Sequence, residues 1–290
     1  MDGFLNVLKP SGPTASDVVV KLKKIFSQKK VGHLGTLDPG ASGVLPIALG
    51  KATRLFDLLT FKTKKYRVYF TFGTTTNTLD SYGIKTCEKS FTFSDDDLKN
   101  AIKTFIGKIQ QIPPSYSAIS INGIRAYDLA RQGRYVDLPE RSVEIFAFEI
   151  IDKISDDTWC FDITCSGGTY MRSIARDLAE KLNTVAYMSC LIRIFSGQFD
   201  LSTAKTIEEI ERAPLESLLD VRYPLAKYPD LSVPEKYHKS LYNGVKLSGL
   251  RNLTNNISDI DYYNVYCAGE YFGLGSFENE NLVIKYRLID

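Results

Sequence analysis

One acidic side chain stands in a segment whose backbone the sequence makes stiff in places and permissive in others. Asp38 is followed by Pro39 and lies within residues 32–47, which also hold several glycines. Proline fixes a backbone dihedral, and glycine lets another chain approach closely. A carboxylate held in such a turn can act as a nucleophile or as a proton acceptor. An aspartate before proline is also a common turn residue, so the residue types alone leave both interpretations open.

Other kinds of chemistry lack the residues that they need. The chain has two histidines, His33 and His238, and its five cysteines form no Cys-x-x-Cys pair, which argues against a zinc site. Gly50 and Lys51 resemble the end of a phosphate-binding loop, but Leu45 stands where that loop needs glycine. We therefore predict neither a metal nor a cofactor, and a chemistry carried by ordinary side chains.

The composition places the protein in a reducing, aqueous compartment. The odd number of cysteines is typical of reduced thiols in a cytosolic protein, and we predict a cytoplasmic location. No stretch approaches the roughly 20 apolar residues of a membrane-spanning helix. The N-terminal residues, with an early acid and a Pro-Gly-type break, do not resemble a signal peptide.

Basic residues are concentrated around Asp38. Residues 21–67 hold eleven lysines and arginines against two acids, Asp38 and Asp57, so their net charge is +9 in a chain whose total is +2. The remainder of the chain therefore carries −7. A basic region on an otherwise acidic protein is the expected footprint of a polyanionic partner. Solvated surface lysines would give the same charge run, so charge alone does not distinguish a binding site for a polyanion from an ordinary exposed surface.

Hydrophobic periodicity indicates the elements that must position these residues. Apolar residues spaced at i, i+4, i+7 and i+8 predict a helix with Ser16 as its N-cap. Residues 66–72 alternate as a strand, as do residues 159–165. Capping boxes predict further helices that begin at Ser94 and at Thr206. Strands mixed with a few helices, without a regular βαβ rhythm, predict an α+β fold.

Three prolines between residues 224 and 234 interrupt a polar connector and predict a boundary there. We place one domain at residues 1–228 and a second at residues 229–290. In the second, residues 262–266 and 270–274 predict a hairpin, and a last strand lies near residues 282–286. A β module of this size is marginal for independent stability.

The string at residues 32–47 resembles the catalytic motif of the TruB family of tRNA pseudouridine synthases. Further resemblances to this family lie at residues 3–17 (its N-terminal Lys-Pro motif), 65–68 (its strand with a base-stacking tyrosine), 111–133, 166–174 (its third motif) and 272–275 (its C-terminal PUA-like module). The resemblance implies the pseudouridine synthase catalytic fold for residues 1–228, with a mixed, largely antiparallel sheet flanked by helices. It implies a small PUA-like RNA-binding β module for residues 229–290.

The resemblance assigns the chemistry to Asp38, which matches the essential aspartate of the family. Such enzymes detach uracil from C1′, turn it and rejoin it through C5 without a cofactor. Whether Asp38 attacks as a nucleophile or accepts a proton is left open. Arg172 matches an arginine that pairs with this aspartate and holds it as an oriented anion. Outside the motif, Arg172 would be interpreted as a surface arginine at the start of a helix.

The resemblance also implies contacts with RNA. Tyr66 would stack on the target base and Tyr170 would lie near the sugar and base edge, since the base must leave the RNA stack to react. His33 would prop open the loop around the flipped nucleotide, and Leu191 would pack on the uracil. Without the resemblance, the tyrosines and Leu191 would be core residues and His33 a loop residue. The predicted phosphate contacts are Lys64 and Lys65.

The resemblance therefore implies an enzyme that isomerises uridine-55 in the T-stem-loop of tRNA. It would act as a monomer, with tRNA as its partner and no obligatory protein partner. One alternative is a tRNA-binding or tRNA-folding protein without catalysis, and another is a pseudouridine synthase for a different RNA, such as the RNA-guided archaeal and eukaryotic relatives. A third is a glycosidase-like hydrolase, which needs a second carboxylate. Asp80 is the candidate for that carboxylate, although its setting is that of a turn residue.

Overall fold

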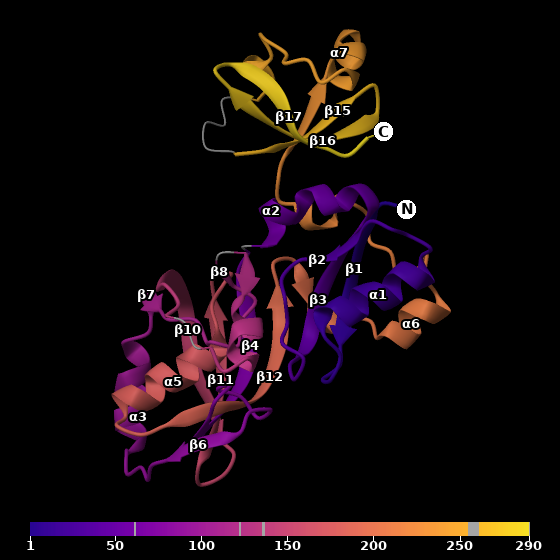
Figure 1. Ribbon diagram of the computed structural model, residues 1–290. Helices are drawn as coiled ribbons and strands as arrows, with labels where there is room; N and C mark the ends of the chain where they lie inside the picture. Colours follow the sequence, from indigo (N-terminus) through magenta and orange to yellow (C-terminus); the bar gives the residue numbers. More distant parts are fainter. Residues whose placement is uncertain (61, 122, 135–136, 255–260, 290) are drawn as a thin grey trace.

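The computed structural model describes residues 1–60, 62–121, 123–134, 137–254 and 261–289. Within these residues, one sheet has nine strands in the order β1-β3-β12-β4-β11-β10-β7, with β2 paired to β3 and β13 paired to β12 (Figure 1). Its strands are β1 (Gly3–Lys9), β2 (Val31–His33), β3 (Ser42–Leu49), β4 (Lys64–Phe72), β7 (Gly107–Gln111), β10 (Arg141–Lys153), β11 (Thr158–Cys165), β12 (Ala186–Ser196) and β13 (Phe199–Asp200).

Strand β12 joins the two halves of this sheet. It pairs antiparallel with β4 along most of its length, but it meets β3 in parallel through only two residue pairs, Ile192 with Ser42 and Arg193 with Gly43. The other pairs in the sheet are antiparallel. Figure 1 shows β12 running between the β1–β3 half and the β4–β7 half. The predicted α+β class, with a mixed and largely antiparallel sheet, is confirmed.

The strand alternation predicted for residues 66–72 is confirmed in β4. Tyr66, Val68 and Phe70 are buried, while the residues between them are partly exposed, because successive side chains of a strand point to opposite faces. The inward residues of β4 and β11 pack together with one side of a helix, α5, in the largest apolar cluster. Packing of this cluster fixes which face of β4 turns inward.

Helices flank the sheet at both ends. Those that lie beside the sheet are α1 (Ala15–Ile25), α3 (Asp95–Lys103), α5 (Met171–Lys181) and α6 (Ile207–Arg212). Helices α1 and α6 lie beside the β1–β3 half, and α3 and α5 cover the β4 half (Figure 1). The shorter helices and strands of this region are α2 (Phe56–Thr60), α4 (Ala126–Arg131), β5 (Thr74–Thr76), β6 (Lys85–Glu88), β8 (Ser120–Ile121) and β9 (Ile124–Arg125).

The capping boxes at Ser94 and Thr206 are confirmed, but the N-cap predicted for the first helix is wrong. Thr14, not Ser16, caps α1. The Thr14 hydroxyl accepts from the Asp17 amide at 3.0 Å, and the Asp17 carboxylate accepts from the Thr14 amide at 2.8 Å. This reciprocal pair satisfies two free amides at once, which a cap at Ser16 would not do.

A second sheet forms the C-terminal part of the chain, in the order β14-β15-β16-β17. It comprises β14 (Asp230–Val233), β15 (Tyr263–Cys267), β16 (Glu270–Glu278) and β17 (Asn281–Arg287), with α7 (His238–Tyr242) beside it. The predicted hairpin and last strand are confirmed. Figure 1 shows this sheet at the top, next to α2. It has its own core, but Leu274 and Leu288 also pack with Phe4 and Leu225 of the larger part.

Candidate active site

Asp38 lies in the loop between β2 and β3, and its side chain is 33% exposed. Two buried cations hold the backbone of this loop. The Lys9 ammonium donates to the carbonyl oxygens of Pro39 at 3.1 Å and Ala41 at 2.7 Å. The Arg193 guanidinium donates to carbonyl oxygens at three more positions, 35, 36 and 44, at 2.7–3.2 Å. The turn that carries the carboxylate is therefore clamped on both sides.

Neither of these clamping residues was assigned a role in the site from sequence. Lys9 and Arg193 are both fully buried, at 0% exposure. Burial lowers the pKa of Lys9 to about 8, and the nearby Asp38 carboxylate acts in the opposite direction. A lysine before proline and an arginine inside a strand carry no local signal of this function, because the carbonyl groups that they bind lie far along the chain.

Arg172 is the partner of Asp38, as predicted from the resemblance. It sits in the first turn of α5 and is 5% exposed, and its Nε lies 2.9 Å from Asp38 Oδ2. The same guanidinium donates through Nη1 to the Thr78 carbonyl at 3.2 Å. A guanidinium fixed at two points can hold a carboxylate in one orientation.

A second acid lies beside the same guanidinium. Asp80 Oδ2 is 3.7 Å from Arg172 Nη1, and the Asp80 side chain is 16% exposed. Asp80 Oδ1 accepts from the Thr78 hydroxyl at 2.6 Å and from the Tyr82 amide at 3.0 Å. Asp80 is thus a turn residue, as its sequence setting indicates, and also part of the charge network around Asp38. A turn signal cannot reveal a partner on a distant helix.

The two predicted tyrosines lie near Asp38 in different environments. Tyr66 is 6% exposed within the main core. Burial raises the pKa of Tyr66 to about 12. Tyr170 precedes α5 and is partly exposed, and burial raises its pKa as well. The Asp38 charge contributes to both pKa shifts, which places both phenols within its electrostatic reach. Gln111 holds the Tyr170 backbone by two hydrogen bonds of 2.8 and 3.1 Å.

His33 and Leu191 lie on the strands that adjoin the loop. His33 ends β2 and is partly buried, and its Nδ1 has no hydrogen-bond partner among the described residues. Burial, and then the charge of Arg193, lowers the pKa of His33, so its ring is neutral at neutral pH. Leu191 lies on β12 and is 6% exposed within the core. Both are near the loop, but Leu191 presents little surface to solvent.

The phosphate contact predicted for Lys64 is wrong. Lys64 is 4% exposed, and its ammonium donates to the carbonyl oxygens of Thr60 at 2.7 Å and Lys62 at 2.9 Å. It shares the inward face of β4 with Tyr66, so it cannot reach a phosphate group outside. Lys65 points the other way, where its ammonium lies 3.0 Å from Asp162. A phosphate contact by Lys65 stays a prediction, and Asp162 competes for that charge.

Asp162 neutralises positive charge on the outward face of β4, where it pairs with Lys65 and Arg67. Arg67 donates to its two carboxylate oxygens at 2.8 and 3.0 Å. Burial alone would raise the pKa of Asp162, but hydrogen bonds from Arg67 and Lys65 lower it.

Among the described residues, no group of three or more His, Cys, Asp or Glu side chains could hold a metal ion. In that same part of the chain, no helix is both long and apolar enough to cross a membrane.

Comparisons with known proteins agree with this geometry. Residues 23–171 match the model of the TruB family pseudouridylate synthases, N-terminal domain. The chain is 42% identical to tRNA pseudouridine synthase B of Alkaliphilus oremlandii, over 99% of this chain and 96% of that protein. It is 39% identical to the protein of the same name from Clostridium perfringens, over the full length of both.

A solved structure shares the fold at greater distance. A chain of an H/ACA RNP bound to a substrate RNA containing 2′-deoxyuridine aligns with a TM-score of 0.73 and 21% identity, over 99% of this chain and 85% of that one. The family model and the full-length relatives identify the protein as a pseudouridine synthase. The chain belongs to the TruB family of pseudouridylate synthases.

Proposed function

We propose that this protein converts uridine-55 in the T-stem-loop of tRNA to pseudouridine, with Asp38 as the essential carboxylate. The relatives named tRNA pseudouridine synthase B, which match over the whole chain, support tRNA as the substrate. The observation that carries the catalytic assignment is the Arg172 Nε–Asp38 Oδ2 pair at 2.9 Å, in which the carboxylate still has 33% exposure. An anion that is both oriented and accessible suits attack or proton transfer.

The reaction is an isomerisation, so its atoms balance without a co-substrate. The bond between uracil N1 and ribose C1′ breaks, a bond between C5 and C1′ forms, the hydrogen of C5 is released, and N1 gains a proton. Asp38 serves at the sugar or the base as nucleophile or proton acceptor. The reacting base has to leave the RNA stack, and Tyr66 and Tyr170 are the phenols near the carboxylate that would receive it. Stacking on Tyr66 requires its largely buried ring to become accessible.

The remaining contacts follow from the same proposal. His33 would prop open the loop around the flipped nucleotide, and Leu191 would pack against uracil. Lys65 would contact a phosphate group. The predicted domain of residues 229–290 would bind RNA as a PUA-like module. We expect a monomer that acts in the cytoplasm.

Release of tritium from uracil C5 tests the proposal. The wild-type protein should release about one equivalent from an unmodified tRNA transcript labelled at C5, and none when uridine-55 is replaced by cytidine. Asp38→Asn should release none while the dissociation constant for tRNA stays within a few-fold. Asp57→Asn is the matched control, because Asp57 is the other acid of the basic segment and is exposed, and it should keep turnover.

Each outcome separates the proposal from an alternative. Binding without tritium release by the wild-type protein would indicate an RNA-binding protein. Release from the cytidine-55 transcript would indicate another target nucleotide, and free uracil among the products would indicate a hydrolase. Turnover by Asp38→Asn would remove this carboxylate from the chemistry.

A further inference from the structure

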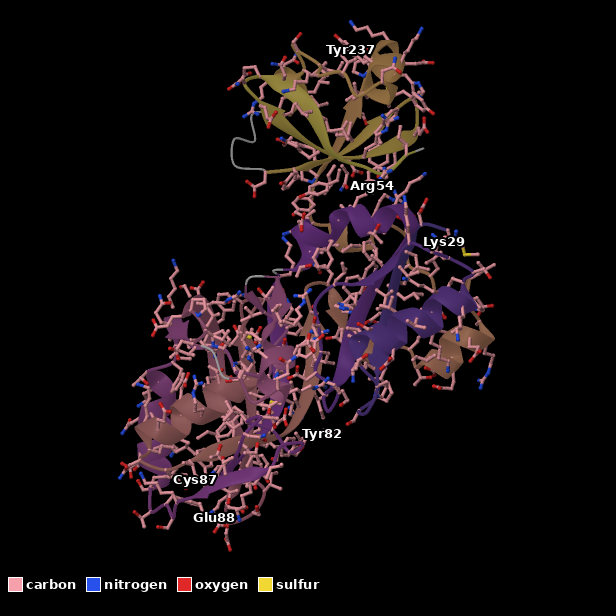
Figure 2. All side chains as sticks on the ribbon, in the orientation of Figure 1. Lys29, Arg54, Tyr82, Cys87, Glu88 and Tyr237 are labelled. Carbon is pink, nitrogen blue, oxygen red and sulfur yellow. The ribbon has the colours of Figure 1, made fainter. Side chains whose placement is uncertain are left out.

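Tyr82 is an exposed aromatic side chain beside the catalytic loop. Its exposed fraction is 66%, whereas the other exposed rings of the described residues, Phe56, Phe146 and Tyr242, have exposed fractions of 43–47%. Tyr82 lies in the loop that joins β5 to β6, and Figure 2 labels it at the end of this loop. This exposure leaves most of the Tyr82 side chain free to contact another molecule.

The ring rests on the backbone of the loop that carries Asp38. A Cβ atom added to Gly40 would overlap Cε2 of Tyr82 and lie 2.9 Å from its Cδ2, so this approach requires glycine. The Tyr82 hydroxyl is 3.4 Å from Ser11 Oγ, and the Ser11 hydroxyl donates to the Gly40 carbonyl at 3.0 Å. Part of the ring is therefore seated two residues from Asp38, while the remainder faces solvent.

The backbone of Tyr82 is fixed by the acid that also faces Arg172. The Tyr82 amide donates to Asp80 Oδ1 at 3.0 Å, and Asp80 Oδ2 lies 3.7 Å from Arg172 Nη1. The next residue packs closely too, since a Cβ atom on Gly83 would overlap Thr78 Oγ1. Tyr82 is thus positioned through its ring by the Asp38 loop and through its amide by the Asp80–Arg172 network.

We propose that Tyr82 is a stacking platform for a nucleobase of the substrate RNA that lies next to the reacting uridine. The inference rests on the proposed function, because it needs an RNA nucleotide at Asp38. Pulling one nucleotide out of a stack uncovers the faces of its neighbours. A phenol ring held beside the carboxylate can cover one of those faces, and an aromatic face accepts any base. Tyr82 would thus add affinity next to the site without selecting a sequence.

Fluorescence of 2-aminopurine tests this platform. The probe is a T-stem-loop RNA hairpin with 2-aminopurine placed in turn at each loop position except the target, bound to the Asp38→Asn protein so that no turnover occurs. At one position or more, binding should quench the fluorescence when residue 82 is Tyr or Phe, but not in Tyr82→Ala or Tyr82→Leu. The latter two should weaken binding of the unlabelled hairpin about 5- to 150-fold, the range expected for one stacked base.

The Tyr82→Leu variant distinguishes stacking of the ring on a nucleobase from simple packing of an apolar side chain over Gly40. Tyr82→Leu keeps an apolar side chain over Gly40 but has no ring, so wild-type affinity and quenching in that variant would overturn the proposal and leave Tyr82 as a cover of the loop. Ile84→Ala, two residues along and 76% exposed, is the matched control and should bind like its parent. If the Asp38→Asn protein and the wild-type protein both fail to bind the hairpin, the proposed function falls and the platform falls with it. Binding that Tyr82→Ala leaves unchanged would overturn the platform alone.

Discussion

At the scale of single residues, the site is organised by cations inside the protein. Lys9, Lys64 and Arg193 are between 0% and 4% exposed. Each donates hydrogen bonds to backbone carbonyl oxygens rather than to a carboxylate. Burying a charge costs stability, and hydrogen bonds offset only part of that cost. Lys9 and Arg193 fix the backbone of the Asp38 loop, whereas Lys64 fixes the carbonyl groups of Thr60 and Lys62. The cost should be visible when one of them is replaced.

Lys64 offers the clearest measurement of that cost. Burial, and then the charge of Arg193, lowers the pKa of Lys64 from 10.5 to about 8. Its two acceptors, the carbonyl oxygens of Thr60 and Lys62, need only two N–H groups, so the neutral amine can keep both hydrogen bonds. Between pH 8 and 10.5 the unfolded chain holds a proton at Lys64 that the folded protein has released. The contribution of Lys64 to the free energy of unfolding of the wild-type protein therefore increases as the pH rises.

We predict that Lys64→Met loses this gain. The free energy of unfolding of Lys64→Met, minus that of the wild type, should fall by roughly 2–3 kcal/mol between pH 7 and pH 10, as measured by urea denaturation. Cysteines and tyrosines titrate in the same window and are common to both proteins, so their contributions cancel in the difference, except for Cys165, whose pKa Lys64 lowers. Both proteins therefore carry Cys165→Ala. Lys23→Met removes an exposed lysine and controls for the change of net charge. A difference that stays constant with pH would show that Lys64 is not a costly buried charge.

At the scale of elements, the site depends on the parallel junction between β3 and β12. Gly43 has φ of 107°, and a Cβ atom there would overlap the Arg193 carbonyl oxygen and lie 2.7 Å from the Arg193 nitrogen. Both obstacles are backbone atoms of the paired strand, which cannot move aside without separating the two halves of the sheet. The same displacement would pull Arg193 away from the carbonyl groups of the Asp38 loop.

We predict that Gly43→Ala lowers the free energy of unfolding by more than about 4 kcal/mol, or prevents folding. Gly168→Ala is the matched control, because Gly168 has φ of 89° but no atom within 4 Å of an added Cβ. It should cost only the roughly 1–2 kcal/mol of a left-handed conformation. Denaturant midpoints of the two variants give the comparison. Equal losses would mean that backbone strain, and not the close contact with β12, explains the need for glycine.

Sequence patterns predicted most local features, although the cap of the first helix was placed at Ser16 and not at Thr14, and they missed distant contacts. Alternation in β4 and the capping boxes at Ser94 and Thr206 depend on neighbouring residues, and they were predicted correctly. The same alternation puts Lys64 on the inward side with Tyr66, so its burial was readable from the pattern, although it was predicted as a phosphate contact. The second acid near Arg172 is different. Asp80 meets a helix far along the chain, and only the folded sheet brings them together.

The tryptophan and one cysteine can follow the two parts of the whole molecule separately. Trp159 is the only tryptophan of the chain and lies in the main core, whereas Cys267 is buried in the C-terminal sheet. These parts share an apolar cluster in which Leu274 and Leu288 pack with Phe4. An interface of this kind couples the stabilities of the parts that it joins. We therefore expect the wild-type protein to unfold in one transition, although the C-terminal part is small.

Leu274→Ala should break this coupling. Leu274 is fully buried, and replacing a buried leucine by alanine typically costs about 2–5 kcal/mol. In the variant, thiol labelling of Cys267 should begin at a lower urea concentration than the change in Trp159 fluorescence, whereas the two midpoints coincide in the wild type. Leu178→Ala, an equal truncation in the main core, should lower both midpoints together. Two separate midpoints in the wild-type protein would contradict this, because the shared cluster would then be too weak to join the C-terminal sheet to the part of the molecule that carries Asp38.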